Sequence, residues 1–552
     1  MIRALGALDT VIESIEDLQK FKSEIYLQGQ IASRLQLIKE TLGDRVVPQA
    51  KHDSKGQKER ECHEETRVEV LDEIELWART RSDKKNCWWI TGKPGVGKST
   101  IGAKLSENFE DERSLYAQYF VTRNIAVTTD SDSILPTMAQ QLAKKSPLAA
   151  RVIHDMLETT PLSVVKKLSD RQARVLLLEP LLAIAKYVPK VVVIIDGVDE
   201  VANRDAVLSK VTSVLCSIMS DLPTNVKILI FSRPEETITA EIPHHIKRLD
   251  LGTEISKPDV NKLVRAKLGE LAKAHKWSDW PREDQVSLLC QNAAGHLGWA
   301  ATALRWIAEQ IGYEGKVRRD EAIEEVSKLG IGELYELYDF ILRRMFPPED
   351  PARERYLKGL KTVLGCLVVL QQPLDIGSIS TLLSLNDFDV MYCMRRMSSI
   401  IVDGTKSLTE GTVPRLHKSV VDYLVNHPDL RINLTEQHHS LAISCIKSMP
   451  RLTFNVGRIT TSHQLHKNTH HDSISQCIIY PCRWLKHHLQ NGGKQANLVS
   501  DVDVEIFMKN YFLQWLEVLS LQKLVDSVAV PTLMVLKEQI KVSIHLLTEY
   551  SD

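Results

Sequence analysis

One short segment constrains this chain more than any other: residues 92–99 read GKPGVGKS. The segment directly follows the apolar run CWWIT at 87–91 and precedes a helical pattern that carries Ile101, Leu105 and Phe109. Glycines at this spacing let backbone N–H groups converge on an anion, and the N-terminus of the following helix adds a favourable dipole. The motif GxxxxGK[ST] between a strand and a helix therefore predicts a loop that binds the phosphates of a nucleotide.

The residues of this loop have different expected roles. The ammonium of Lys98 is expected to bridge the β- and γ-phosphates, and the hydroxyl of Ser99 is expected to ligate Mg²⁺. The other nucleotide-binding residues are expected to be those of the loop and of the first helical turn: Gly92, Lys93, Pro94, Gly95, Val96, Gly97 and Thr100.

Three further apolar runs resemble CWWIT: YAQYFV at 116–121, VVVII at 191–195 and ILIF at 228–231. Each run is short and mostly unalternating, as expected for strands buried on both faces of a parallel sheet. Because helical stretches separate the runs, the sequence predicts an α/β fold with helices on both faces of the sheet. The strands of this domain are expected to stop after Pro234.

Two of these runs end in residues that suit phosphate chemistry. Asp196 closes VVVIID, and a carboxylate at the end of a buried strand is where such a protein holds Mg²⁺. One turn further, either Asp199 or Glu200 is expected to polarise the attacking water as a general base, and the pattern leaves both open. Arg233 follows the run ILIFS and is expected to contact the γ-phosphate from the same edge of the sheet.

The amino-acid composition limits the class of protein to which this chain can belong. Hydrophobic residues make up 43 % and charged residues 26 %, which is typical of a folded chain. The net charge of −1 indicates neither a nucleic acid nor a membrane surface as a partner. Nine cysteines without a CxxC pair favour a reducing compartment. With no signal-peptide pattern and no apolar run long enough to span a bilayer, we expect a cytoplasmic protein.

The remaining chain is expected to be helical and to form several domains. A winged-helix-like region is indicated by helices followed by a small hairpin, built from SSIIVDG at 398–404 and VPRLH at 413–417. The apolar stripe of the N-terminal segment is expected to cover the chain's own core. The predicted organisation is an N-terminal helical segment at 1–45, a linker at 46–65, the P-loop NTPase domain at 66–240, a helical domain at 241–333, the winged-helix-like domain at 334–430 and a C-terminal helical domain at 431–552.

Together, WWITGKPGVGKST, DGVDE and SRP resemble the NACHT domain of the STAND class of P-loop NTPases, and in particular fungal NLR-like proteins with a nephrocystin-like N-terminal NTPase module. The resemblance implies that Asp196 serves Mg²⁺ and that Arg233 is the sensor arginine. It also implies that Thr66 and Arg67 lie near the adenine. His417, in RLHKSVVDYL, matches a winged-helix histidine that contacts the bound diphosphate in the closed state.

Three functions are compatible with these motifs. The first is a signalling switch that binds ATP or ADP and hydrolyses ATP slowly with Mg²⁺, opens and self-associates, in response to an unknown trigger and towards an unknown effector. The second is a scaffold that binds nucleotide without turnover. The third is a GTPase, although the guanine-reading Asn-Lys-x-Asp is absent and the nearest match, NKLV at 261–264, lacks the acid.

Histidines and cysteines, which are the usual ligands of zinc, cluster near the C-terminus. Their spacings match no common zinc finger, so the sequence does not predict a metal centre there. The residues are His463, His466, His470, His471, Cys477, Cys482, His487 and His488.

Overall fold

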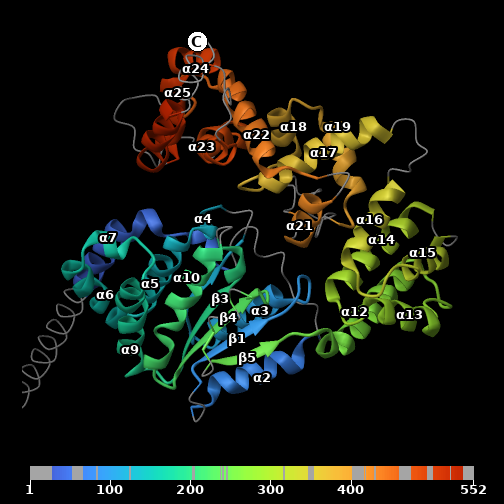
Figure 1. Ribbon diagram of the computed structural model, residues 1–552, viewed down its shortest axis with the longest axis horizontal. Coiled ribbons are helices and arrows are strands. Elements are labelled where there is room, and N and C mark those ends of the chain that lie inside the picture. The colour runs from blue at the N-terminus through green and yellow to red at the C-terminus, as the bar shows by residue number, and fades with distance from the viewer. Residues whose placement is uncertain are drawn as a thin grey trace, which may run out of the picture. The chain divides into compact units, whose positions relative to one another are not determined.

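The computed structural model describes residues 28–52, 66–81, 85–122, 126–201, 205–236, 238, 242–243, 246–314, 318–345, 353–400, 416, 418–427, 431–458, 474–493, 501–522 and 524–538. The chain divides into two compact units, Met1–Ser256 (unit 1) and Lys257–Asp552 (unit 2). Both are drawn in Figure 1.

Unit 1 is built around a five-stranded parallel sheet. The strand order is β2-β3-β4-β1-β5, so strand β4 lies between β1 and β3. The four predicted strands are confirmed as β1 (Cys87–Thr91), β2 (Leu115–Phe120), β3 (Val191–Asp196) and β4 (Val226–Ser232).

The expectation that strands stop after Pro234 is wrong, because a fifth strand, β5 (Lys247–Asp250), pairs with β1. Its sequence KRLD is polar, and its side chains alternate between half-buried and exposed. Such a strand at the edge of a sheet carries no apolar run, so only its pairing reveals it. The sheet therefore continues past residue 240, the expected end of the NTPase domain.

The apolar strands pack against helices on both faces of the sheet (Figure 1). In β1, Cys87 and Trp89 belong to one core while Trp88 and Ile90 belong to the other, which is why this strand reads as a continuous apolar run. The first core is covered by a helix over 28–42 and by α5 (Ile134–Lys145), α6 (Pro147–Thr159), α9 (Glu179–Ala185) and α10 (Asp205–Cys216). The second is covered by α2 (Val68–Arg79) and α3 (Lys98–Asp111).

The described part of the N-terminal stripe behaves as predicted. Ile38 and Leu42 are fully buried in the first core. Short elements complete unit 1: α4 (Ala126–Thr129), α7 (Leu162–Val165), α8 (Asp170–Ala173), the π-helical turn η4 (Arg174–Leu178), and the 3₁₀ turns η1 (Gly43–Arg45), η2 (Pro48–Ala50), η3 (Ser131–Ser133), η5 (Val198–Glu200) and η6 (Met219–Asp221).

Unit 2 consists mainly of helices, and the hairpin predicted over 398–417 lies almost wholly outside the described residues. Its helices are α12 (Thr253–Ala274, which starts in unit 1), α13 (Glu283–Ala293), α14 (Leu297–Glu314), α15 (Arg318–Ser327), α16 (Leu334–Met345), α17 (Arg353–Val369), α18 (Ile376–Leu383), α19 (Asp387–Arg396), α21 (Lys418–Asn426), α22 (Leu434–Ser448), α23 (Gln476–Asn491), α24 (Asp501–Asn510) and α25 (Phe512–Leu521), with the turns η8 (Met449–Arg451) and η11 (Val525–Ala529).

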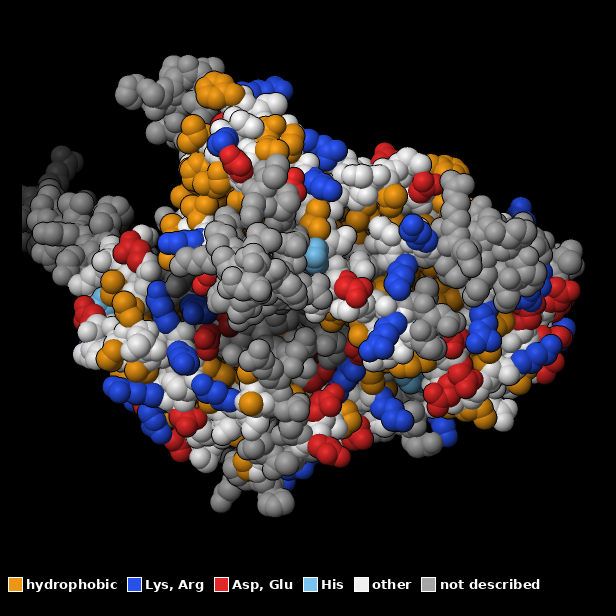
Figure 2. Space-filling model, turned by 45° about the horizontal axis from the view of Figure 1, so that its top comes forward, with side chains coloured by type: hydrophobic (Ala, Val, Ile, Leu, Met, Phe, Trp, Pro, Cys, Tyr) orange, Lys and Arg blue, Asp and Glu red, His pale blue; other side chains and the backbone are white. Residues whose placement is uncertain are grey.

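The distribution of charged side chains on the surface agrees with the nearly equal numbers of basic and acidic residues in the sequence. On the face shown in Figure 2, basic and acidic side chains are interspersed. Among the described residues, no helix combines the length and apolar character needed to cross a bilayer.

Candidate nucleotide-binding site

The loop between β1 and α3 has the backbone of a phosphate cradle. Gly95 and Gly97 adopt positive φ angles of 80° and 89°, a region that disfavours any residue with a Cβ. A Cβ on Gly92 would lie 2.7 Å from Val96 Cγ2, so a side chain there would force Val96 to shift. The glycines are therefore required by the turn itself, which brings the loop to the N-terminus of α3.

Lys98 is the first residue of α3, and its side chain folds back over the loop. Its Nζ donates to the carbonyl oxygens of Gly92 at 2.6 Å and Lys93 at 3.0 Å. Neutral carbonyls are weaker partners for an ammonium than phosphate oxygens, so a bound phosphate would compete well for it. Ser99 and Thr100 follow in the first turn of α3, both half-buried.

The sheet brings the other predicted residues to the edge where this loop lies. Thr91 of β1 pairs in register with Ser232 of β4, and Phe231 pairs with Asp196 of β3. Arg233 follows Ser232 directly. Since the carboxyl ends of parallel strands form the binding crevice of open α/β sheets, the loop, Arg233 and Asp196 share one crevice edge.

Asp196 is the last residue of β3 and is only 1 % exposed. The chain then turns sharply at Gly197, whose φ is 77° and where a Cβ would lie 3.0 Å from the carbonyl oxygen of Val121. This turn leads into η5, which carries Asp199 and Glu200. A carboxylate oxygen at the strand end and the hydroxyl of Ser99 are ligands that Mg²⁺ prefers.

The structure shows how one of the two acids that the sequence left open as general base is held. Oδ1 of Asp199 accepts a hydrogen bond from the backbone N–H of Arg233 at 3.0 Å, and its Oδ2 lies 3.5 Å from Arg233 Nε. Glu200 is half-buried on the same turn. Asp199 is thus engaged with Arg233, which the spacing of the sequence did not foresee.

Thr66 and Arg67 come immediately before α2 and are both buried. Arg67 has a left-handed backbone with φ of 63°, and its Nη2 donates to the carbonyl oxygen of Val96 within the loop. Arg67 therefore holds the phosphate-binding loop through a backbone carbonyl oxygen, and the expected place of Thr66 and Arg67 near the adenine stays a prediction.

Two further residues support the site and were not foreseen. Nε1 of Trp89 donates to Oγ of Ser232 at 2.9 Å, and this hydroxyl donates to the carbonyl oxygen of Arg233 at 3.0 Å. The only sequence signal for them is their position next to the motifs. His417 lies outside the described residues.

Where the structure describes this cluster of histidines and cysteines, His488 contacts other side chains. Nδ1 of His488 lies 2.9 Å from Nδ1 of His438, and its Nε2 lies 2.8 Å from the hydroxyl of Tyr480. Burial raises the pKa of the Cys482 thiol, which disfavours a metal-binding thiolate. His463, His466, His470 and His471 lie outside the described residues.

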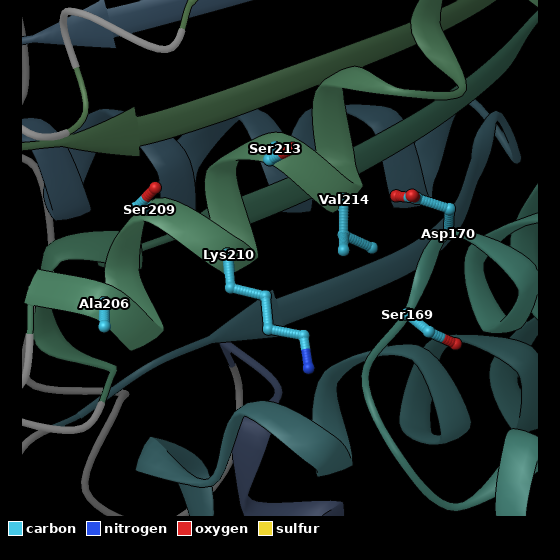
Figure 3. Close-up of a pocket in the computed structure, with 7 residues that line it drawn as sticks. All are labelled: Ser169, Asp170, Ala206, Ser209, Lys210, Ser213 and Val214. Atoms are coloured by element: carbon cyan, nitrogen blue, oxygen red, sulfur yellow. The ribbon is translucent and has the colours of Figure 1, made fainter.

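A separate pocket of about 370 Å³ lies in unit 1, and none of the predicted site residues lines it. Figure 3 shows Lys210 on α10 and Asp170 on a neighbouring element, with three serines among the other lining side chains. In the described part of the chain, His154, Asp155 and Glu158 of α6 also gather their ligand atoms within 4.8 Å of one another.

Comparison with known proteins gives a family match for part of the chain. Residues 66–233 match the family described as Nephrocystin 3, N-terminal. This segment is similar to that family, and it carries the phosphate-binding loop motif between a strand and a helix of a parallel sheet. The match confirms the nephrocystin-like NTPase module expected from the sequence, and it covers the loop, Asp196 and Arg233 together. A search among curated proteins gives no match.

Several solved structures are also similar at low identity. A STAND protein with a tetratricopeptide repeat sensor from Pyrococcus horikoshii is 14 % identical with a TM-score of 0.39, over 89 % of this chain and 59 % of that one. Drosophila ORC bound to DNA is 12 % identical with a TM-score of 0.31, over 71 % and 90 %. Cdc6p from Pyrobaculum aerophilum is 16 % identical with a TM-score of 0.30, over 67 % and 86 %.

Proposed function

We propose that this chain is a signalling switch of the NACHT and STAND type, which holds ADP in a closed state and exchanges it for ATP with Mg²⁺ to open and self-associate. The observation that carries the proposal is the shared sheet edge, where the phosphate-binding loop, Arg233 and Asp196 lie at the carboxyl ends of three neighbouring strands. Slow hydrolysis of ATP would return the switch to its closed state.

The residues present fit a nucleotide with a magnesium ion. The glycine turn would hold the phosphates through backbone N–H groups, and Lys98 would neutralise part of their charge. Ser99 and Asp196 would hold Mg²⁺, which supplies charge neutralisation on the phosphate oxygens. Glu200 would accept the proton of the attacking water, and Arg233 would stabilise the charge on the γ-phosphate.

A scaffold that binds nucleotide without turnover is the main alternative, and a GTPase is the second. Denaturing the purified chain and identifying the released nucleotide tests the proposal most directly. Release of ADP supports the closed switch, whereas GDP supports a GTPase. A chain that releases no nucleotide and binds none when it is added would overturn the proposal. Measurable steady-state turnover then separates a switch that hydrolyses from a scaffold.

We expect Glu200→Gln to retain nucleotide binding and to hydrolyse ATP about 10²- to 10⁴-fold more slowly, because an amide cannot accept the proton of water. Phosphate release under single-turnover conditions measures the rate, and titration calorimetry measures the binding. Glu107→Gln, on the exposed side of α3 beside Lys104, is the matched control. A wild-type rate in Glu200→Gln would show that this carboxylate is not the base.

The second expected outcome concerns His417, for which the sequence resemblance implies a contact with the bound diphosphate. The helix that begins at the next residue, α21, is held to α16: Ser419 Oγ lies 3.0 Å from the hydroxyl of Tyr338, and Asp339 Oδ1 accepts from the hydroxyl of Tyr423 at 2.6 Å. Within unit 2, α21 is therefore fixed to α16.

We therefore expect His417→Ala to release ADP about 10- to 100-fold faster and to self-associate more readily, because one hydrogen bond to a charged group is lost. Release of a fluorescent ADP analogue and light scattering measure the two effects. His154→Ala on α6 serves as the control. An unchanged release rate together with unchanged association would reduce His417 to a packing residue.

A further inference from the structure

Arg233 is held at several points by residues from neighbouring elements. Its backbone N–H and its Nε both face the carboxylate of Asp199, at 3.0 Å and 3.5 Å. Its carbonyl oxygen accepts from Oγ of Ser232 at 3.0 Å, and that hydroxyl accepts from Nε1 of Trp89 on β1 at 2.9 Å. The arginine that follows β4 is thus tied both to the turn after β3 and to the strand that leads into the phosphate-binding loop.

The two side chains of the pair differ in solvent exposure. The Asp199 side chain is 4 % exposed, whereas that of Arg233 is 17 % exposed. A carboxylate so buried, with both oxygens directed at Arg233, is poorly placed to accept a proton from water, because protonation would weaken a charge-assisted contact. The Asp199 carboxylate is instead suited to orienting the guanidinium of Arg233. Without such a partner, the long arginine side chain would lose considerable rotamer entropy when it binds a ligand.

We propose that Asp199 is a positioning residue that holds Arg233 towards the γ-phosphate, so that the preference of this site for ATP over ADP depends on the pair. This inference rests on the proposed nucleotide site. It removes Asp199 from the candidates for general base and leaves Glu200 in that role. Because ADP lacks the γ-phosphate, loss of the pair should weaken the binding of ATP far more than that of ADP.

A double-mutant cycle with Asp199→Asn, Arg233→Ala and the combined variant tests the inference on the full chain. Titration calorimetry with Mg²⁺ gives the affinities for ADP and for a non-hydrolysable ATP analogue. We expect each single variant to lose tenfold or more in affinity for the analogue and about twofold or less for ADP. The double variant should be no weaker than Arg233→Ala, because Asp199 acts through the arginine.

Glu107→Gln is the matched control, since it also removes one negative charge, on the exposed surface of α3. It should leave both affinities and their ratio at the wild-type values. Additive losses in the double variant, or equal losses for ADP and the analogue, would overturn the positioning role. A wild-type chain that binds neither nucleotide would instead refute the proposed function, and the inference with it.

Circular dichroism and thermal unfolding check that each variant folds. Should Asp199→Asn fail to fold, Asp199→Glu provides a second test, because it keeps the negative charge but shifts the carboxylate away from the backbone N–H and the Nε of Arg233. A selective loss of affinity for the ATP analogue in this variant supports the inference. An unchanged ratio of affinities would contradict it.

Discussion

Lys98→Ala is expected to weaken the binding of both ADP and ATP by about 10²- to 10⁴-fold while the fold of unit 1 persists. The Lys98 side chain is half-buried, and its Nζ donates to two carbonyl oxygens of the loop, so its removal takes no side chain out of the apolar core. Two charge-assisted hydrogen bonds to phosphate oxygens are each worth about 1.5–3 kcal/mol, which gives the expected range. Titration calorimetry measures the loss.

The control for this variant is Lys104→Ala, which removes one positive charge from the same helix. Lys104 pairs with Glu107 at 3.2 Å on the surface, and both side chains are well exposed. Its removal should change nucleotide affinity by no more than about twofold, because exposed pairs contribute little. Equal affinities for Lys98→Ala and the wild type would exclude the loop as the nucleotide site.

Acid is expected to loosen the packing of α22 on α23 in unit 2. A hydrogen-bonded chain runs from the backbone N–H of Gln371 to the hydroxyl of Tyr480 at 3.3 Å, then to Nε2 of His488 at 2.8 Å. Nδ1 of His488 can then donate to Nδ1 of His438, 2.9 Å away. A further proton on Nδ1 of His438 would place two N–H groups against each other, and one on Nε2 of His488 would oppose the hydrogen that Tyr480 donates, so this arrangement holds both histidines neutral.

The sign of the pH dependence follows from the direction of the pKa shifts. Burial, and then the neighbouring His487, lowers the pKa of His438 to about 3, and burial lowers that of His487 to about 4. Burial also holds the pKa of His488 well below its usual range. The unfolded chain binds these protons below about pH 6.5 and the folded chain does not, so stability is full above that pH and falls as the pH drops towards 4.

Each histidine contributes up to about 1.4 kcal/mol per pH unit over this window. Hydrogen exchange, corrected for the intrinsic exchange rate, should show less protection of α22 and α23 at pH 5 than at pH 7. His488→Gln should flatten this dependence, and His154→Gln in unit 1 should leave it intact. Equal protection at the two pH values in the wild type would contradict the expectation.

Local pattern was sufficient to identify the phosphate-binding loop. The glycines, Lys98 and Ser99 lie within eight residues, and their geometry depends only on a strand that ends and a helix that begins. The strands β1 to β4 could also be recognised in the sequence, because strands buried on both faces of a sheet are continuously apolar. The sequence by itself therefore established the α/β fold and the position of the loop.

Only the tertiary structure decided how the residues of the site meet. The position of β4 between β1 and β3 places Arg233 beside the loop, and the register of these strands brings Asp199 to Arg233. The polar edge strand β5 and the pairing of His438 with His488 likewise join segments that are distant in sequence or carry no apolar signal. Such contacts depend on strand order and helix packing, which are set by burial over the whole unit rather than by neighbouring residues along the chain.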